Sequence, residues 1–199
     1  GPSEVLIISD KNKDFKKLAA DLIAQAEHGE DSKCIYVHIG KEGIDDLFKE
    51  LNVQVNIAPR SKTIKSALEK NSIFIQVKNI NEAIEINNLF SPEHLQIISK
   101  HYKTSLLKEI SAGAIFIGEN NTAVLGDYAA GPSHVIPTNS SARFSSPVSI
   151  EDFLVRSSVT SIKSIKDKKI YNELLNNSIF LAELEGLYGH ANALKLRKK

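Results

Sequence analysis

The segment EVLIISDKNKDFKKLAADLIAQAEHG, residues 4–29, contains the two patterns that decide the fold. Its first six residues form a short apolar run, which is typical of a buried strand. The apolar side chains that follow are spaced by three and four residues, as on one face of a helix: Phe15, Leu18, Ala19, Leu22, Ile23 and Ala26. A strand followed by a helix is the repeating element of an α/β fold.

The same alternation continues to residue 118. Further strands are predicted at KCIYVHI (33–39), SIFIQV (72–77), HLQIIS (94–99) and AGAIFIG (112–118). Helices are predicted at GIDDLFKEL (43–51), TIKSALEK (63–70), INEAIEINNLF (80–90) and, as a short helix, TSLLKEI (104–110). Alternating strands and helices indicate a mostly parallel sheet that is covered on both faces.

The pattern changes after residue 118. Residues 119–147 are rich in Gly, Pro, Ser and Asn, and we expect a long functional loop there. From Ser149, which is suited to cap the segment IEDFLVR, the chain is predicted to be chiefly helical. The glycines form neither a GxGxxG nor a Walker motif, so no dinucleotide or triphosphate fingerprint is present.

Composition excludes several classes of function. The 25 basic and 24 acidic residues give a net charge of +1, which offers no electrostatic attraction for nucleic acid or an anionic membrane. The single cysteine, Cys34, lies in a predicted strand, where it is expected to be a small buried hydrophobe. One cysteine excludes a disulfide within the chain and suits a reducing compartment, so we expect a cytoplasmic protein. Because the chain opens on a strand and lacks methionine, we expect a fragment or a processed product.

Two residues near the end of the first helix are candidate metal ligands. Gln25 and His28 are three apart, so both are expected on one helical face, whereas Glu27 is expected to point elsewhere. An amide oxygen and an imidazole that project together can bind a metal ion. The alternative for His28 is a favourable interaction with the helix dipole, because Gly29 ends the helix there.

The segment SPEHLQI, residues 91–97, places Glu93 beside His94 at the mouth of a predicted strand. A glutamate with a raised pKa is a plausible general base, and histidine is the natural proton shuttle near neutrality. The alternative is an exposed charged pair in a loop.

Four more candidates lie later in the chain. Asp127 and His134 belong to the long loop, in GDYAAGPSHVIP, and Glu185 and His190 lie in EGLYGHANAL. The last two are five residues apart, which is not one helical face, so we expect a turn at Gly189 between them. Two imidazoles, a carboxylate and an amide drawn from three distant segments would form an N/O site that suits zinc or another borderline divalent ion.

Taken together, the strings GPSEVL, DLIAQAEHG, SPEHLQI, AGAIFIG, GDYAAGPSHVIPT, ARFSS and EGLYGHANAL resemble the C-terminal half of histidinol dehydrogenase. The resemblance covers essentially the whole chain. It implies an incomplete Rossmann-like domain over residues 1–148, carrying most of the zinc and acid–base residues, and a helical tail over 149–199 that is exchanged within a homodimer.

The resemblance also implies the chemistry. The family oxidises L-histidinol to L-histidine in two NAD-linked steps through histidinal, at the end of histidine biosynthesis. It implies Glu93 and His94 as the acid–base pair and Gln25, His28, Asp127 and His190 as zinc ligands. The implied substrate contacts are Ser3, Gln25, His28, His94, Asp127, His134, Glu185 and His190.

The N-terminal half of the family is absent from this sequence, and with it most of the expected NAD contacts. Two other interpretations therefore stand beside the enzyme. In the first, the isolated chain is a zinc-binding, dimerising module that is inactive without its other half. In the second, the chain is a zinc hydrolase, but the sequence lacks the HExxH spacing of zinc peptidases.

Overall fold

The computed structural model describes residues 3–10, 14–41, 43–131, 133–162 and 166–198. The chain divides into two compact units, Gly1–Phe153 and Leu154–Lys199. The predicted domains of 1–148 and 149–199 also assign roles to the two parts, and those roles stay predictions.

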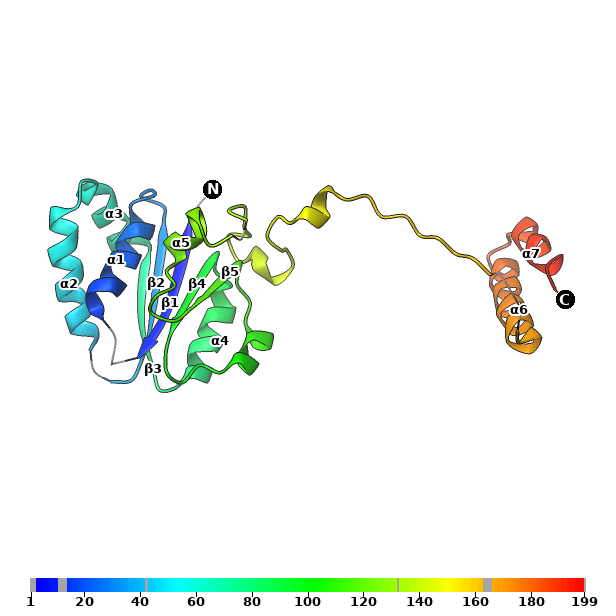
Figure 1. The fold of residues 1–199 in the computed structure, drawn as a ribbon, viewed down its shortest axis with the longest axis horizontal. Coiled ribbons are helices and arrows are strands. Elements are labelled where there is room, and N and C mark those ends of the chain that lie inside the picture. The colour runs from blue at the N-terminus through cyan, green and yellow to red at the C-terminus, as the bar shows by residue number, and fades with distance from the viewer. Residues whose placement is uncertain (1–2, 11–13, 42, 132, 163–165, 199) are drawn as a thin grey trace. The chain divides into compact units, whose positions relative to one another are not determined.

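The first unit is built on a parallel sheet of five strands in the order β3-β2-β1-β4-β5 (Figure 1). The strands are β1 (Glu4–Asp10), β2 (Lys33–Ile39), β3 (Ser72–Val77), β4 (His94–Ile98) and β5 (Ala114–Ile117). Every pairing between neighbours is parallel. The predicted α/β fold with a mostly parallel sheet is therefore confirmed.

Helices cover both faces of this sheet, which explains why its strands are continuously apolar. Helices α1 (Phe15–Ala26), α2 (Ile44–Ile57) and α3 (Ser61–Asn71) contribute to the core on one face. Helix α4 (Ile80–Phe90) packs on the other face. The side chains of β1 alternate between the two cores, with Val5 and Ile7 in the first and Leu6 and Ile8 in the second.

Three local predictions need correction. Helix α2 continues to Ile57, past the predicted end at Leu51, because Leu51 and Val55 extend its buried stripe. The segment Thr104–Glu109 is a 3-10 helix, η1. The long stretch after β5 is interrupted by a short helix, α5 (Ala123–Tyr128), and by two single 3-10 turns, η2 (Ser141–Arg143) and η3 (Ile150–Phe153).

The second unit is a pair of helices, α6 (Lys168–Leu184) and α7 (Tyr188–Lys195). Four buried side chains form its core: Leu175, Ile179, Ala182 and Ala191. Residues 154–162 have no regular structure, so the prediction of a chiefly helical chain from Ser149 was wrong there. The break between the helices lies at Gly186, whose φ is 72°, whereas Gly189 lies inside α7. Among the described residues, no helix is both long enough and apolar enough to span a bilayer.

Candidate acid–base site at the amino-terminal edge of the sheet

The candidate residues gather where the strands begin. Val5 pairs with Cys34 on one side and with His94 on the other, and His94 pairs with Ala114. The amino ends of β1, β2, β4 and β5 therefore lie at one edge. Ligands of open α/β sheets commonly bind at the opposite, carboxyl edge. The edge used here is the one at which α1 ends and α5 lies, and those helices carry further candidates.

Glu93 is held in place by the start of β1. Its Oε2 accepts hydrogen bonds from Ser3 Oγ at 3.0 Å and from the Glu4 backbone N–H at 2.9 Å. The side chain is only 12% exposed. Two donors on one oxygen fix the orientation of this carboxylate. The alternative of a freely exposed charged pair does not describe it, and the structure brings Ser3 and Glu93 together across 90 residues of sequence.

His94 is oriented by the same backbone. Its Nδ1 lies 3.1 Å from the carbonyl oxygen of Glu4. A carbonyl can only accept, so Nδ1 carries the proton in this hydrogen bond, and a neutral ring then has its basic lone pair on Nε2. That Nε2 lies 3.5 Å from Asp127 Oδ1. The imidazole, 7% exposed, therefore presents its basic nitrogen toward Asp127.

Asp127 sits in the last turn of α5 and not in a loop as predicted. Thr122 caps this helix, since its side chain accepts a hydrogen bond from the Val124 N–H. Asp127 is 21% exposed, and its Oδ1 lies 3.6 Å from Nδ1 of His134, which is 74% exposed. One carboxylate oxygen thus lies between two imidazoles, one buried and one accessible to solvent.

A cavity of ≈ 380 Å³ opens beside this group. It is lined by Ala24, Glu27, His28, Arg60, Val124, Asp127, Tyr128 and His134. The structure therefore places His28 at the same cavity as Asp127 and His134. Glu27 lines it too, contrary to prediction, because α1 ends at Ala26 and helical spacing no longer applies. Sequence reasoning missed Arg60 altogether, whereas Tyr128 adjoins Asp127 in the sequence.

Gln25 and His28 lie on either side of the end of α1. Gln25 lies in the last turn of α1 and is 6% exposed, whereas His28 lies beyond the helix end and is exposed at the cavity. The side-chain nitrogen of Gln25 is buried and has no hydrogen-bond partner within the described part of the chain. Because the two ends of an amide are distinguished only by their partners, this is an amide group whose hydrogen bonding is incomplete.

No three His, Cys, Asp or Glu side chains among the described residues are grouped as a metal site. The predicted ligand set includes an amide, and its fourth member, His190, belongs to the second unit. The first unit would therefore contribute only His28 and Asp127 of those four residue types. The assignment of Gln25, His28, Asp127 and His190 as zinc ligands stays a prediction.

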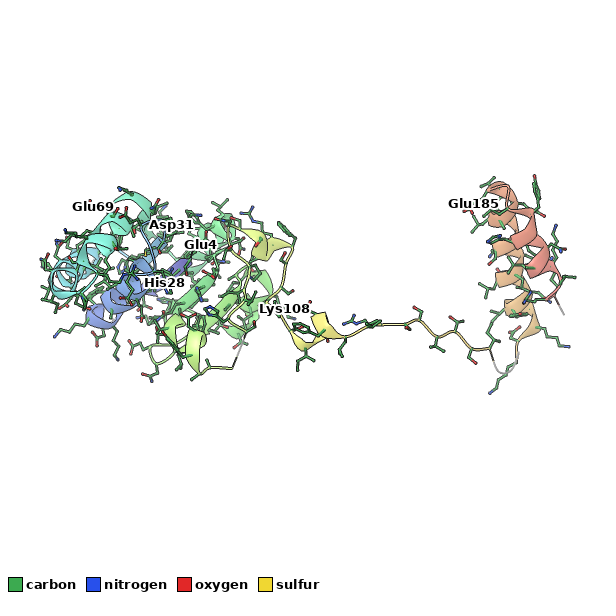
Figure 2. All side chains as sticks on the ribbon, turned by 90° about the horizontal axis from the view of Figure 1, so that it is seen from above. Glu4, His28, Asp31, Glu69, Lys108 and Glu185 are labelled. Carbon is green, nitrogen blue, oxygen red and sulfur yellow. The ribbon has the colours of Figure 1, made fainter. Side chains whose placement is uncertain are left out.

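The two candidates of the second unit lie on either side of the helix break. Glu185 follows the last residue of α6, and His190 lies in the first turn of α7. Both side chains are exposed (Figure 2 labels Glu185). Their proposed contacts with substrate or metal stay predictions.

Comparison with known proteins gives consistent matches. The family model described as histidinol dehydrogenase matches residues 1–198. The histidinol dehydrogenase of Clostridium acetobutylicum is 41% identical over 100% of this chain and 45% of its own length. That of Methanocaldococcus jannaschii is 37% identical over the same shares. A crystal structure of histidinol dehydrogenase from Elizabethkingia anophelis superposes with a TM-score of 0.89 at 32% identity, over 99% of this chain and 44% of that one. The chain thus spans less than half the length of these relatives.

Proposed function

This chain belongs to the histidinol dehydrogenase family, and from that premise we propose that it supplies the acid–base and metal-binding residues of an enzyme that oxidises L-histidinol to L-histidine. Because the chain spans 45% of its relatives' length, we assign the activity to the chain together with the remaining segment of such an enzyme. NAD would supply the hydride acceptor, and we expect that other segment to hold most of it.

The fixed imidazole of His94 is the observation that carries this proposal. With Nδ1 engaged by the Glu4 carbonyl, Nε2 is the atom that can take a proton. In the first oxidation, the alcohol O–H proton passes to Nε2 while the carbon gives up a hydride. The product is the aldehyde, histidinal.

The second oxidation needs a water molecule, which gives Glu93 its role. Its carboxylate takes a proton from water as the water oxygen adds to the aldehyde carbon, and the proton that His94 took in the first oxidation passes to the aldehyde oxygen, which completes the hydrate. His94, neutral again, then takes a hydroxyl proton of the hydrate as its carbon loses a second hydride to NAD, which gives the carboxylic acid of histidine. The acid, Glu93 and His94 each release a proton to solvent. Ser3 Oγ and the Glu4 N–H hold Glu93 beside His94, whose Nδ1 is 3.5 Å from Oε2. Two adjacent bases thus serve two different proton donors.

We propose that Gln25, His28 and Asp127 bind zinc together with His190 of a second copy of the chain. The donor set of amide, carboxylate and two imidazoles suits this ion. The incompletely bonded amide of Gln25 and the shared cavity of His28 and Asp127 support it. Zinc would orient the substrate by binding its imidazole and amino nitrogens. Ser3, His134 and Glu185 are proposed as further substrate contacts.

The state of the isolated chain is a separate proposal. We expect it to bind zinc without oxidising histidinol, because the segment expected to hold NAD is not part of it. We also propose that two copies exchange their second units. Several large apolar side chains of that unit are exposed, and burial against another chain would remove them from water: Ile170, Leu174, Phe180, Leu181 and Leu184.

Complementation of a histidine-requiring bacterium that lacks histidinol dehydrogenase tests the function. The chain would be co-expressed with the N-terminal segment of the Clostridium acetobutylicum relative, and growth scored on L-histidinol. We expect growth with the wild-type pair and none with either segment alone or with His94→Ala. Failure of the wild-type pair to support growth, with both segments present and folded, would contradict the proposal.

A further inference from the structure

A carboxylate that has no part in the proposed chemistry joins three elements of the site. Asp21 lies on α1, and each of its oxygens accepts one short hydrogen bond. Thr122 Oγ1 donates to Oδ1 at 2.8 Å, and Gln96 Nε2 donates to Oδ2 at 2.8 Å. Thr122 is the N-cap of α5, and Gln96 is a fully buried residue of β4. One side chain therefore connects α1, α5 and β4.

Each of these elements carries a proposed site residue. On α1, Gln25 follows Asp21 by one helical turn. On β4, His94 is two residues before Gln96, so both point to the same face of the sheet. On α5, Asp127 lies in the last turn of the helix that Thr122 caps. Asp21 thus connects the elements that carry a proposed metal ligand, the proposed proton acceptor and the carboxylate that faces His94.

The Thr122 hydroxyl accepts one hydrogen bond and donates another. It accepts from the Val124 N–H at 3.3 Å and gives its only proton to Asp21. Burial raises the pKa of Asp21, while the Thr122 and Gln96 donors counteract that rise. The start of α5 is therefore fixed to α1 by an oriented hydrogen bond.

The other end of α5 is fixed by close packing. A Cβ at Gly126 would collide with the ring of Phe116 on β5, so the helix backbone lies directly against that ring. Phe116 also lies beside the imidazole of His94, with ring centroids 6.1 Å apart. Helix α5 has only six residues and contributes one buried side chain of its own, Ala123. Its position therefore depends on these two attachments.

We propose that Asp21 is a positioning residue, which through Thr122 holds α5, and with it Asp127, against His94. The expected effects on zinc binding and turnover rest on the proposed function, whereas the position of α5 does not depend on it. Without the Asp21 hydrogen bond, α5 would keep its packing on Phe116 and the burial of Ala123, and we expect the 3.5 Å contact between Asp127 and His94 to be lost for part of the time.

Two variants and a rescue variant test this. Asp21→Asn removes the charge and one acceptor, and Thr122→Val removes the hydroxyl at nearly constant volume. Thr122→Ser keeps the hydroxyl and should restore wild-type behaviour. The matched control is Asn79→Ala, which removes the N-cap of α4, where Asn79 Oδ1 accepts from the Glu82 N–H at 3.0 Å. That control lowers stability without touching the site.

Amide hydrogen exchange of the chain reports on the structural part. We expect exchange within α5 to rise on the order of ten-fold in Asp21→Asn and Thr122→Val, but not in Thr122→Ser or Asn79→Ala. Unchanged α5 exchange in both test variants overturns the inference without affecting the proposed function.

Two measurements report on the functional consequences of the Asp21 contacts. One is zinc affinity, from competition with a zinc-chelating dye, and the other is kcat with L-histidinol in the presence of the complementary segment. We expect zinc affinity and kcat to fall on the order of ten-fold or more in the two test variants only. If the wild type itself neither binds zinc nor oxidises histidinol, the proposed function fails. If the wild type does both and the test variants behave like Asn79→Ala, the positioning role is refuted.

Discussion

Replacing Glu93 with glutamine separates the two oxidations. Glutamine keeps the shape of the side chain, and its amide oxygen can still accept from Ser3 Oγ and the Glu4 N–H, as Oε2 does at 3.0 and 2.9 Å. The fold and the hydrogen bond from His94 to the Glu4 carbonyl are therefore preserved. Only the negative charge that accepts a proton from water is removed. A lost general base costs roughly 10²- to 10⁴-fold in rate, and we expect that loss in the step from histidinal to histidine.

The assay follows each step separately, with the chain and its complementary segment. L-histidinol with a trap for the aldehyde reports the first oxidation, and L-histidinal reports the second. We expect the first rate to change by less than about ten-fold, because His94 is its base, and the second to fall by at least about a hundred-fold. Equal losses in both steps would refute the role of Glu93 as the base for water.

Three further predictions concern metal binding and the core. His28→Ala should abolish most zinc binding, measured by dye competition, while Glu27→Gln at the same cavity should leave it unchanged; normal zinc occupancy in His28→Ala would contradict the ligand assignment. Cys34 is fully buried and burial raises its pKa to about 12, so it should resist alkylation at neutral pH until the chain is unfolded, and rapid native labelling would be inconsistent with this packing. Burial also raises the pKa of Tyr36 from 10.0 to about 12. Its stabilising contribution is therefore complete below pH 10 and is lost as the pH rises through 12. Measured by urea unfolding, the free energy of unfolding of the wild type should fall by up to about 3 kcal/mol relative to that of Tyr36→Phe between pH 10 and 12. Parallel plots of this free energy against pH for the two proteins would refute the pKa shift.

Periodicity was sufficient to predict the sheet, because its strands are buried on both faces and read as apolar runs. The segment EVLIIS contributes to both cores, and each of the five predicted strands is present. The position of Glu93 and His94 at the start of β4 could also be predicted, since they follow Pro92, whereas their acid–base roles stay a prediction. What could not be predicted was the set of contacts made by Ser3 and Glu4, which lie about 90 residues away in the sequence.

The errors have local physical causes. Helix α5 escaped prediction because it is short and contains Gly126, which reads as a loop residue but is required for contact with Phe116. The expectation that Glu27 points away from His28 was wrong, because α1 ends at Ala26 and Glu27 lines the same cavity as His28. Asp21 carried one available signal, its position one helical turn before Gln25. Its importance became visible only when Thr122, about 100 residues later, was seen to donate to it.

The yield of NADH per histidine formed tests whether both oxidations take place at this site. The chain and its complementary segment would be supplied with L-histidinol, NAD and zinc, and both products quantified together. We expect two molecules of NADH for each histidine, with none from the chain alone. Absence of NADH from the folded pair, or release of histidinal with one NADH per histidinol consumed, would contradict the assignment of both oxidations to this site.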